Sequence, residues 1–137
     1  MSRILGIDFG RKRTGLAWTD VLRMIAHPIG TIETKDLIPT LQKTVTEGPV
    51  NLIVIGYPKR MNLEDSHITR DVEALRNRLR KLFPDIEIVL YDERLTSKIA
   101  HQTLIDSGVS KSRRREKELI NTVSAVIILQ DYLQFIS

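Results

Sequence analysis

The chain has 137 residues, which fits one domain (residues 1–137), and 42% of them are hydrophobic, enough for a core without covalent staples. It contains no cysteine, so disulfides, thiolate nucleophiles and cysteine-ligated metal centres are excluded, and a reducing compartment is indicated. The formal net charge of +4 does not by itself distinguish between classes of function, because many enzymes are mildly basic. Because we find neither a signal-peptide pattern nor an apolar segment of membrane-spanning length, we expect a cytoplasmic, soluble protein.

Three strands are predicted first along the chain, at residues 3–8, 14–19 and 27–33. The connection between the first two is too short for anything but a hairpin, so we expect an antiparallel meander. After residue 33, helical spacing of apolar residues alternates with short apolar runs. The remaining predicted elements are a helix at 36–47, a strand at 51–57, a helix from 65 or 66 to 83, a strand at 87–91, and helices at 96–107 and 116–135.

Strands that are separated by helices run parallel, and right-handed crossovers restrict their placement. The simplest arrangement is an α/β fold with a five-stranded mixed sheet in the order 3-2-1-4-5, strands 1–3 antiparallel, and helices on both faces. In the first strand Ile4, Gly6 and Asp8 share one face. Ligands of such sheets gather beyond the carboxyl ends of the strands, where the strand order reverses. That point lies beside Asp8.

Two acids follow strand ends: Asp8 closes the first strand and Glu93 follows the fifth. Carboxylates that are brought together repel each other, and a pair of divalent metal ions acting on a phosphate is the leading candidate to neutralise them. The alternatives are a turn cap at Gly10 for Asp8 and a salt-bridged turn for Glu93. A third ligand is expected from the last helix, where Glu118 and Asn121 are three residues apart and share a face.

The cations gather in clusters, two of which directly follow predicted strand ends. Most charge runs are solvated loops, but this placement indicates contact with a polyanion. The hairpin bracketed by Gly10 and Gly15 could offer backbone amides to a phosphate, or could be an ordinary turn whose glycines supply positive φ. The predicted nucleic-acid-binding residues are Arg11, Lys12, Arg13, Lys59, Arg60, Arg94, Lys111, Arg113, Arg114 and Arg115.

Four segments together resemble the YqgF/RuvX family over essentially the whole chain: residues 6–15 (GIDFGRKRTG), 55–58 (IGYP), 92–96 (DERLT) and 127–133 (IILQDYL). This bacterial family is described as Holliday junction resolvases and as nucleases that process pre-16S rRNA. The resemblance implies an RNase H-like fold and phosphodiester hydrolysis that depends on Mg²⁺ or Mn²⁺. Asp8 and Glu93 match the family's first two catalytic acids, and Asn121 stands where the third, usually an aspartate, is expected.

The leading hypothesis is therefore an endonuclease that uses two metal ions, acts on structured RNA or a DNA junction, and most simply processes the 5′ end of pre-16S rRNA. Asp8 would bridge the ions, with Glu93 and either Asn121 or Glu118 holding one each. The second hypothesis is a weak or inactive nucleic-acid-binding protein, because Asn121 carries no charge. Increased cleavage by an Asn121→Asp variant would favour the weakened nuclease.

A third hypothesis is an ATP-using relative of sugar kinases or actin, in which similar glycine hairpins cradle phosphates. That site requires two domains, and ATP binding would support it. The pattern does not choose between RNA and DNA. A monomer is preferred over a dimer, because no dimerisation stripe stands out.

Overall fold

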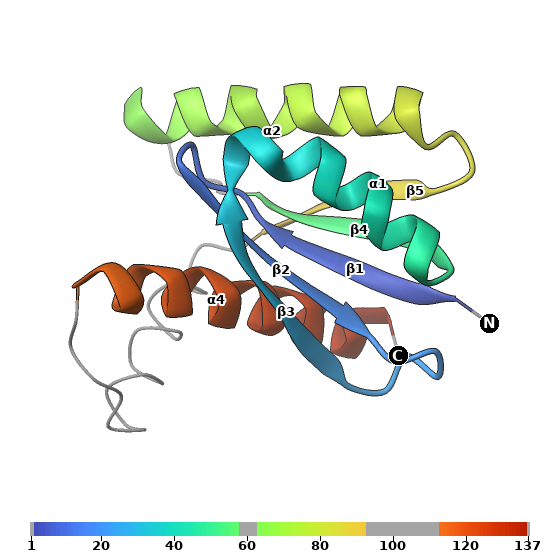
Figure 1. Cartoon of the computed structure of the whole chain (residues 1–137). Helices are drawn as coiled ribbons and strands as arrows, with labels where there is room; N and C mark the ends of the chain where they lie inside the picture. The colour runs from blue at the N-terminus through green and yellow to red at the C-terminus, as the bar shows by residue number, and fades with distance from the viewer. Residues whose placement is uncertain (1, 58–62, 93–112, 137) are drawn as a thin grey trace.

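The computed structural model describes residues 2–57, 63–92 and 113–136. In this part of the chain one mixed sheet is covered by helices on both faces (Figure 1). The predicted helix at 96–107 lies outside the described residues. The described elements are β1 (Arg3–Asp8), β2 (Arg13–Thr19), β3 (Ala26–Glu33), the 3₁₀ turn η1 (Thr34–Asp36), α1 (Leu37–Glu47), β4 (Val50–Tyr57), α2 (Leu63–Leu82), β5 (Glu87–Asp92) and α4 (Arg113–Ile136).

The strand order is β3-β2-β1-β4-β5, which confirms the predicted sheet. The β1–β2 and β2–β3 pairs are antiparallel, whereas β4 is parallel to both β1 and β5. Ile7 of β1 is level with Ile55 of β4, which is level with Leu90 of β5. The three parallel strands therefore end at the same edge of the sheet, at Asp8, Tyr57 and Asp92.

Alternation along β1 separates two cores, as predicted. Leu5 and Ile7 pack with side chains of α1 and α2 on one face, including Leu41 and Leu79. Ile4 packs on the other face, where α4 supplies Ile128 and Leu129 among others. Because side chains alternate across a strand, Gly6 and Asp8 belong to the face that α4 covers (Figure 1).

Two helix starts differ from the predictions. The second helix begins at Leu63, before the predicted caps at residues 65 and 66, and the last helix begins at Arg113, three residues before the predicted start. The cluster at 113–115, which a helix start at residue 116 would have left in the preceding loop, is therefore helical. Arginine is a good helix former, so a run of arginines extends a helix as readily as it fills a loop. None of the helices that the structure describes is long and apolar enough to cross a bilayer.

Candidate functional site

Asp8 is the predicted acid whose environment the structure describes best. It is the last residue of β1 and only 8% exposed. A carboxylate this buried needs partners, because removing its charge from water is costly, and Asp8 does interact with another group in the structure. Across the β1–β2 ladder it is paired with Gly15. The two residues lie on the same face, which is the face that α4 covers.

Helix α4 crosses the sheet directly over two glycines. A Cβ atom on Gly15 would lie 1.9 Å from the carbonyl oxygen of Asn121, and one on Gly6 would lie 3.1 Å from the Cβ of Leu129. At Gly15 only a residue without a side chain lets the helix backbone approach so closely, whereas at Gly6 a side chain would be a tight fit. This crossing therefore places the backbone of Asn121 over Gly15 of β2, and Gly15 is the ladder partner of Asp8 on the neighbouring strand.

Two contacts with β3 hold α4 in this register. The hydroxyl oxygens of Thr31 and Thr122 are 2.6 Å apart and share a hydrogen bond. Further along the helix, the backbone N–H of Ala26 donates to the side-chain oxygen of Gln130 at 3.3 Å. The position of Asn121 over the sheet therefore depends on β3 as well as on the glycines of β1 and β2.

The connection between β1 and β2 is a tight turn held by hydroxyl groups. The carbonyl oxygen of Gly10 accepts hydrogen bonds from the hydroxyls of Thr14 and Thr34. The backbone N–H of Thr34 donates to the carbonyl oxygen of Lys12 at 2.9 Å. These bonds order the hairpin before any ligand arrives.

The glycines of this hairpin serve close approach. A Cβ on Gly10 would lie 2.3 Å from the carbonyl oxygen of Arg13. Among the described glycines, positive φ occurs only at Gly30 (φ 142°), so the alternative in which Gly10 and Gly15 supply positive φ to the turn is wrong. Steric exclusion, and not an unusual backbone conformation, requires glycine at both positions.

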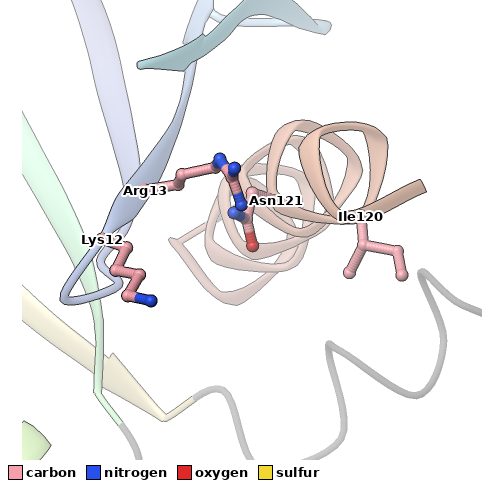
Figure 2. A pocket seen from close by; sticks show the side chains of 4 residues that line it. All are labelled: Lys12, Arg13, Ile120 and Asn121. Atoms are coloured by element: carbon pink, nitrogen blue, oxygen red, sulfur yellow. The ribbon is translucent and has the colours of Figure 1, made fainter. Parts of the chain in front are cut away.

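The three cations of the hairpin have different surroundings. The Nε of Arg11 lies 3.0 Å from Oδ2 of Asp71, so this side chain is tied to α2 at the surface. Lys12 and Arg13 instead line a pocket of about 250 Å³ together with Ile120 and Asn121 of α4. Figure 2 shows the Arg13 side chain reaching from β2 toward Asn121. The hairpin therefore presents two of its three predicted nucleic-acid-binding cations beside the third predicted catalytic residue.

Part of the predicted site lies outside the residues and side chains that the structure describes. The described residues do not include Glu93, Arg94, Lys59, Arg60 or Lys111. The backbone of α4 includes four further ones, namely Glu118, Arg113, Arg114 and Arg115. Among the described side chains, no group of three or more histidines and acids could hold a metal ion. Of the predicted acidic ligands, Asp8 is the one whose side chain the structure describes. Its oxygen donors are of the type that Mg²⁺ and Mn²⁺ accept.

Sequence reasoning did not single out Thr34 or Ile120. Thr34 holds the hairpin turn although it follows β3, and Ile120 supplies an apolar wall beside Asn121. No local pattern marks Thr34, because its partner Gly10 is 24 residues away. Ile120 could have been suspected, since it immediately precedes Asn121, which stands where the family's third acid is expected.

Solved structures with a similar fold belong to the RNase H-like class. The structure of Thermus thermophilus RuvC in complex with a Holliday junction substrate aligns with a TM-score of 0.59 and 13% identity, covering 98% of this chain and 95% of that one. A second Thermus thermophilus RuvC structure gives a TM-score of 0.53 at 11% identity, covering 97% and 95%. At these identities the likeness establishes the fold alone, an RNase H-like α/β fold.

Sequence comparison identifies the family. The model of the RuvX family, described as Holliday junction resolvase, matches residues 2–135. A protein of Phocaeicola vulgatus is 47% identical over 98% of this chain and 96% of its own length, and one of Porphyromonas gingivalis is 46% identical over 97% and 96%. Both carry the name "Putative pre-16S rRNA nuclease". The chain belongs to the RuvX family, which confirms the resemblance seen in its motifs.

Proposed function

We propose that this protein is a nuclease that hydrolyses phosphodiester bonds of precursor 16S rRNA with the help of divalent metal ions. One observation carries the proposal: Asp8, buried at the carboxyl end of β1, is paired with Gly15, over which α4 brings Asn121. Asp8 is at the edge of the sheet where the parallel strands end and where ligands of such sheets gather, which supports the proposal. The names of the relatives support the reaction class and the substrate.

In this proposal Asp8 and Glu93 are the principal ligands of two Mg²⁺ or Mn²⁺ ions. The third carboxylate comes from Glu118, which precedes Asn121 by three residues and therefore shares its side of α4. Such ions, when bound, lower the pKa of a water molecule and stabilise the leaving oxygen. No serine or cysteine nucleophile is required.

In this proposal the cations of the chain bind the phosphates, and burial of Asp8 strengthens the electrostatic interactions at the site. Low exposure of Asp8 strengthens its electrostatic interactions, because less water screens them. Lys12 and Arg13 hold phosphates next to the acid, and the hairpin hydrogen bonds keep them there without reorganisation. We propose that one domain, acting as a monomer in the cytoplasm, carries all these groups. The more distant phosphate contacts are Arg11, Lys59, Arg60, Arg94, Lys111, Arg113, Arg114 and Arg115.

Cleavage of two substrates side by side tests the proposal. A precursor 16S rRNA leader and a four-way DNA junction are incubated with Mg²⁺, with Mn²⁺ and with chelator. We expect metal-dependent cleavage of the leader, slowed about a hundredfold or more by Asp8→Asn, which removes the charge but keeps the shape. Equal rates for the wild type and Asp8→Asn would contradict the proposal, and preferential cleavage of the junction would change the substrate.

The second candidate is a nucleic-acid-binding protein without catalytic activity. Asn121 favours it, because the third position carries no charge to balance a second dication. It predicts salt-sensitive RNA binding without cleavage under any metal condition of the same assay. Cleavage that Asp8→Asn abolishes would exclude it.

A further inference from the structure

The pocket between the β1–β2 hairpin and α4 is lined by two cations, an amide and an apolar side chain. We call it the hairpin pocket, and its described lining is Lys12, Arg13, Ile120 and Asn121. We propose that it binds one phosphodiester group of the nucleic acid, and that Asn121 donates hydrogen bonds to this phosphate and is not a metal ligand. The inference rests on the proposed function only in taking nucleic acid as the ligand.

The donors in the hairpin pocket suit a phosphate. Lys12 carries three N–H donors, Arg13 a planar fork of five, and the Asn121 amide two. A guanidinium fork matches two phosphate oxygens at once. No carboxylate occurs among the described lining residues, and within the described part of the chain neither Lys12 nor Arg13 forms an ion pair. Arg11, by contrast, is already paired with Asp71 outside the pocket.

Ile120 narrows the choice of ligand. It forms the apolar wall of the hairpin pocket and is half-buried. In Figure 2 it lies on the side of the pocket away from Lys12. A free inorganic phosphate has no surface for such a wall, whereas a nucleotide unit presents the carbon atoms of its sugar. The pocket therefore fits a phosphate within a nucleic-acid chain better than a free ion.

The neutral amide at position 121 follows from this role. The contact at Gly15 holds this turn of α4 against β2, so residue 121 faces the cations of the hairpin. An aspartate there would attract Arg13 and repel an incoming phosphate. An asparagine leaves the positive charge of the pocket intact and adds two donors. The proposal thus reverses the effect expected of Asn121→Asp if residue 121 were a weakened metal ligand.

The test is RNA binding in chelator, where no metal contributes. Anisotropy of a labelled single-stranded RNA oligonucleotide gives the affinity at several salt concentrations for Arg13→Gln, Lys12→Gln and Asn121→Asp. We expect each variant to bind about tenfold more weakly, and Arg13→Gln to reduce the slope of log affinity against log salt by roughly 0.7. Matched controls are Arg80→Gln and Asn77→Asp, both exposed on α2, which should change neither quantity.

Three results would overturn the proposal. One is wild-type RNA affinity of Asn121→Asp in chelator together with an unchanged salt slope of Arg13→Gln. Another is tighter Mn²⁺ binding by Asn121→Asp in calorimetry without RNA, which would put residue 121 at the metal. The last is displacement of the labelled RNA by inorganic phosphate at a concentration as low as the phosphate concentration of an unlabelled RNA that displaces it. Thermal unfolding checks that each variant is folded. If Asn121→Asp is not folded, the RNA affinity and salt slope of Arg13→Gln alone test the proposal. Failure of the nuclease proposal would appear differently, as absence of cleavage with intact metal-free binding.

Discussion

The two turns of the antiparallel meander lie at opposite ends of β2 and are built in contrasting ways. The turn after β1 is basic and is held by Thr34, a residue that follows β3. The turn after β2 exposes apolar side chains, including Leu22 and Met24, and is held by its own first residue, Asp20. Order at the first turn depends on tertiary contacts, whereas order at the second is encoded within six residues, 20–25.

This contrast has a functional meaning. The side chain of Asp20 accepts hydrogen bonds from the backbone N–H groups of Leu22, Met24 and Ile25 at 2.9–3.2 Å, so this turn forms locally. The basic turn is held in part by Thr34, which follows β3, and the register of α4 is held in part by Thr31 of β3. Folding of the whole meander therefore assembles the hairpin pocket and its cations together.

The largest effect is expected where α4 crosses β2. Gly15→Ala would place a methyl group within 1.9 Å of the Asn121 carbonyl oxygen, so the helix must move away from the sheet. We expect a loss of about 3 kcal/mol of unfolding free energy, measured by urea denaturation, with loss of any nuclease activity. Gly48→Ala is the control, since its nearest neighbour would be an ordinary 3.4 Å away. Equal stability of the two variants would show that the helix does not depend on this contact.

An intermediate effect is expected at the threonine that spans the basic turn. Thr34→Val keeps the shape but removes the hydroxyl that donates to Gly10, at a cost of about 1 kcal/mol. Because the turn becomes looser, the loss in free energy of RNA binding, measured in chelator, should exceed the loss in free energy of unfolding. Thr46→Val is the matched control, because the Thr46 hydroxyl also donates to a backbone carbonyl, but within α1. RNA affinity that stays at the wild-type level would mean that the turn is ordered without Thr34.

The smallest effect is expected at the apolar turn and depends on pH. The hydrogen bond from the N–H of Ile25, with those from Met24 and Leu22, lowers the pKa of Asp20 below its usual value. The ionised form is therefore favoured in the folded state. The stabilisation is fully present above the pKa of the unfolded chain and is lost as pH falls through the lower folded pKa.

Amide hydrogen exchange measured by NMR tests this linkage. The N–H groups of Leu22, Met24 and Ile25 should lose protection in acid before the sheet does, and Asp20→Asn should weaken protection already at neutral pH. The hairpin pocket should be unaffected in that variant, because Thr34 and not Asp20 holds it. Unchanged protection in acid would show that the turn does not depend on the carboxylate.

The sequence alone determined the class of sheet and the place of Asp8 within it. Short connections force β1, β2 and β3 into a meander, helices between the later strands make them parallel, and alternation assigns Asp8 to one face. These are local constraints, which can be read from neighbours in the chain. Motifs in the same segments also identified the family.

The tertiary structure alone decided which of the predicted residues meet. Gly15 lies more than 100 residues before Asn121, and nothing near either residue shows that the helix backbone passes over that glycine. The same holds for Arg11, whose partner Asp71 belongs to α2, and for the pairing of Thr34 with Gly10. Contacts between distant segments depend on how whole elements pack, and packing is decided by the sum of many side chains and not by a local pattern.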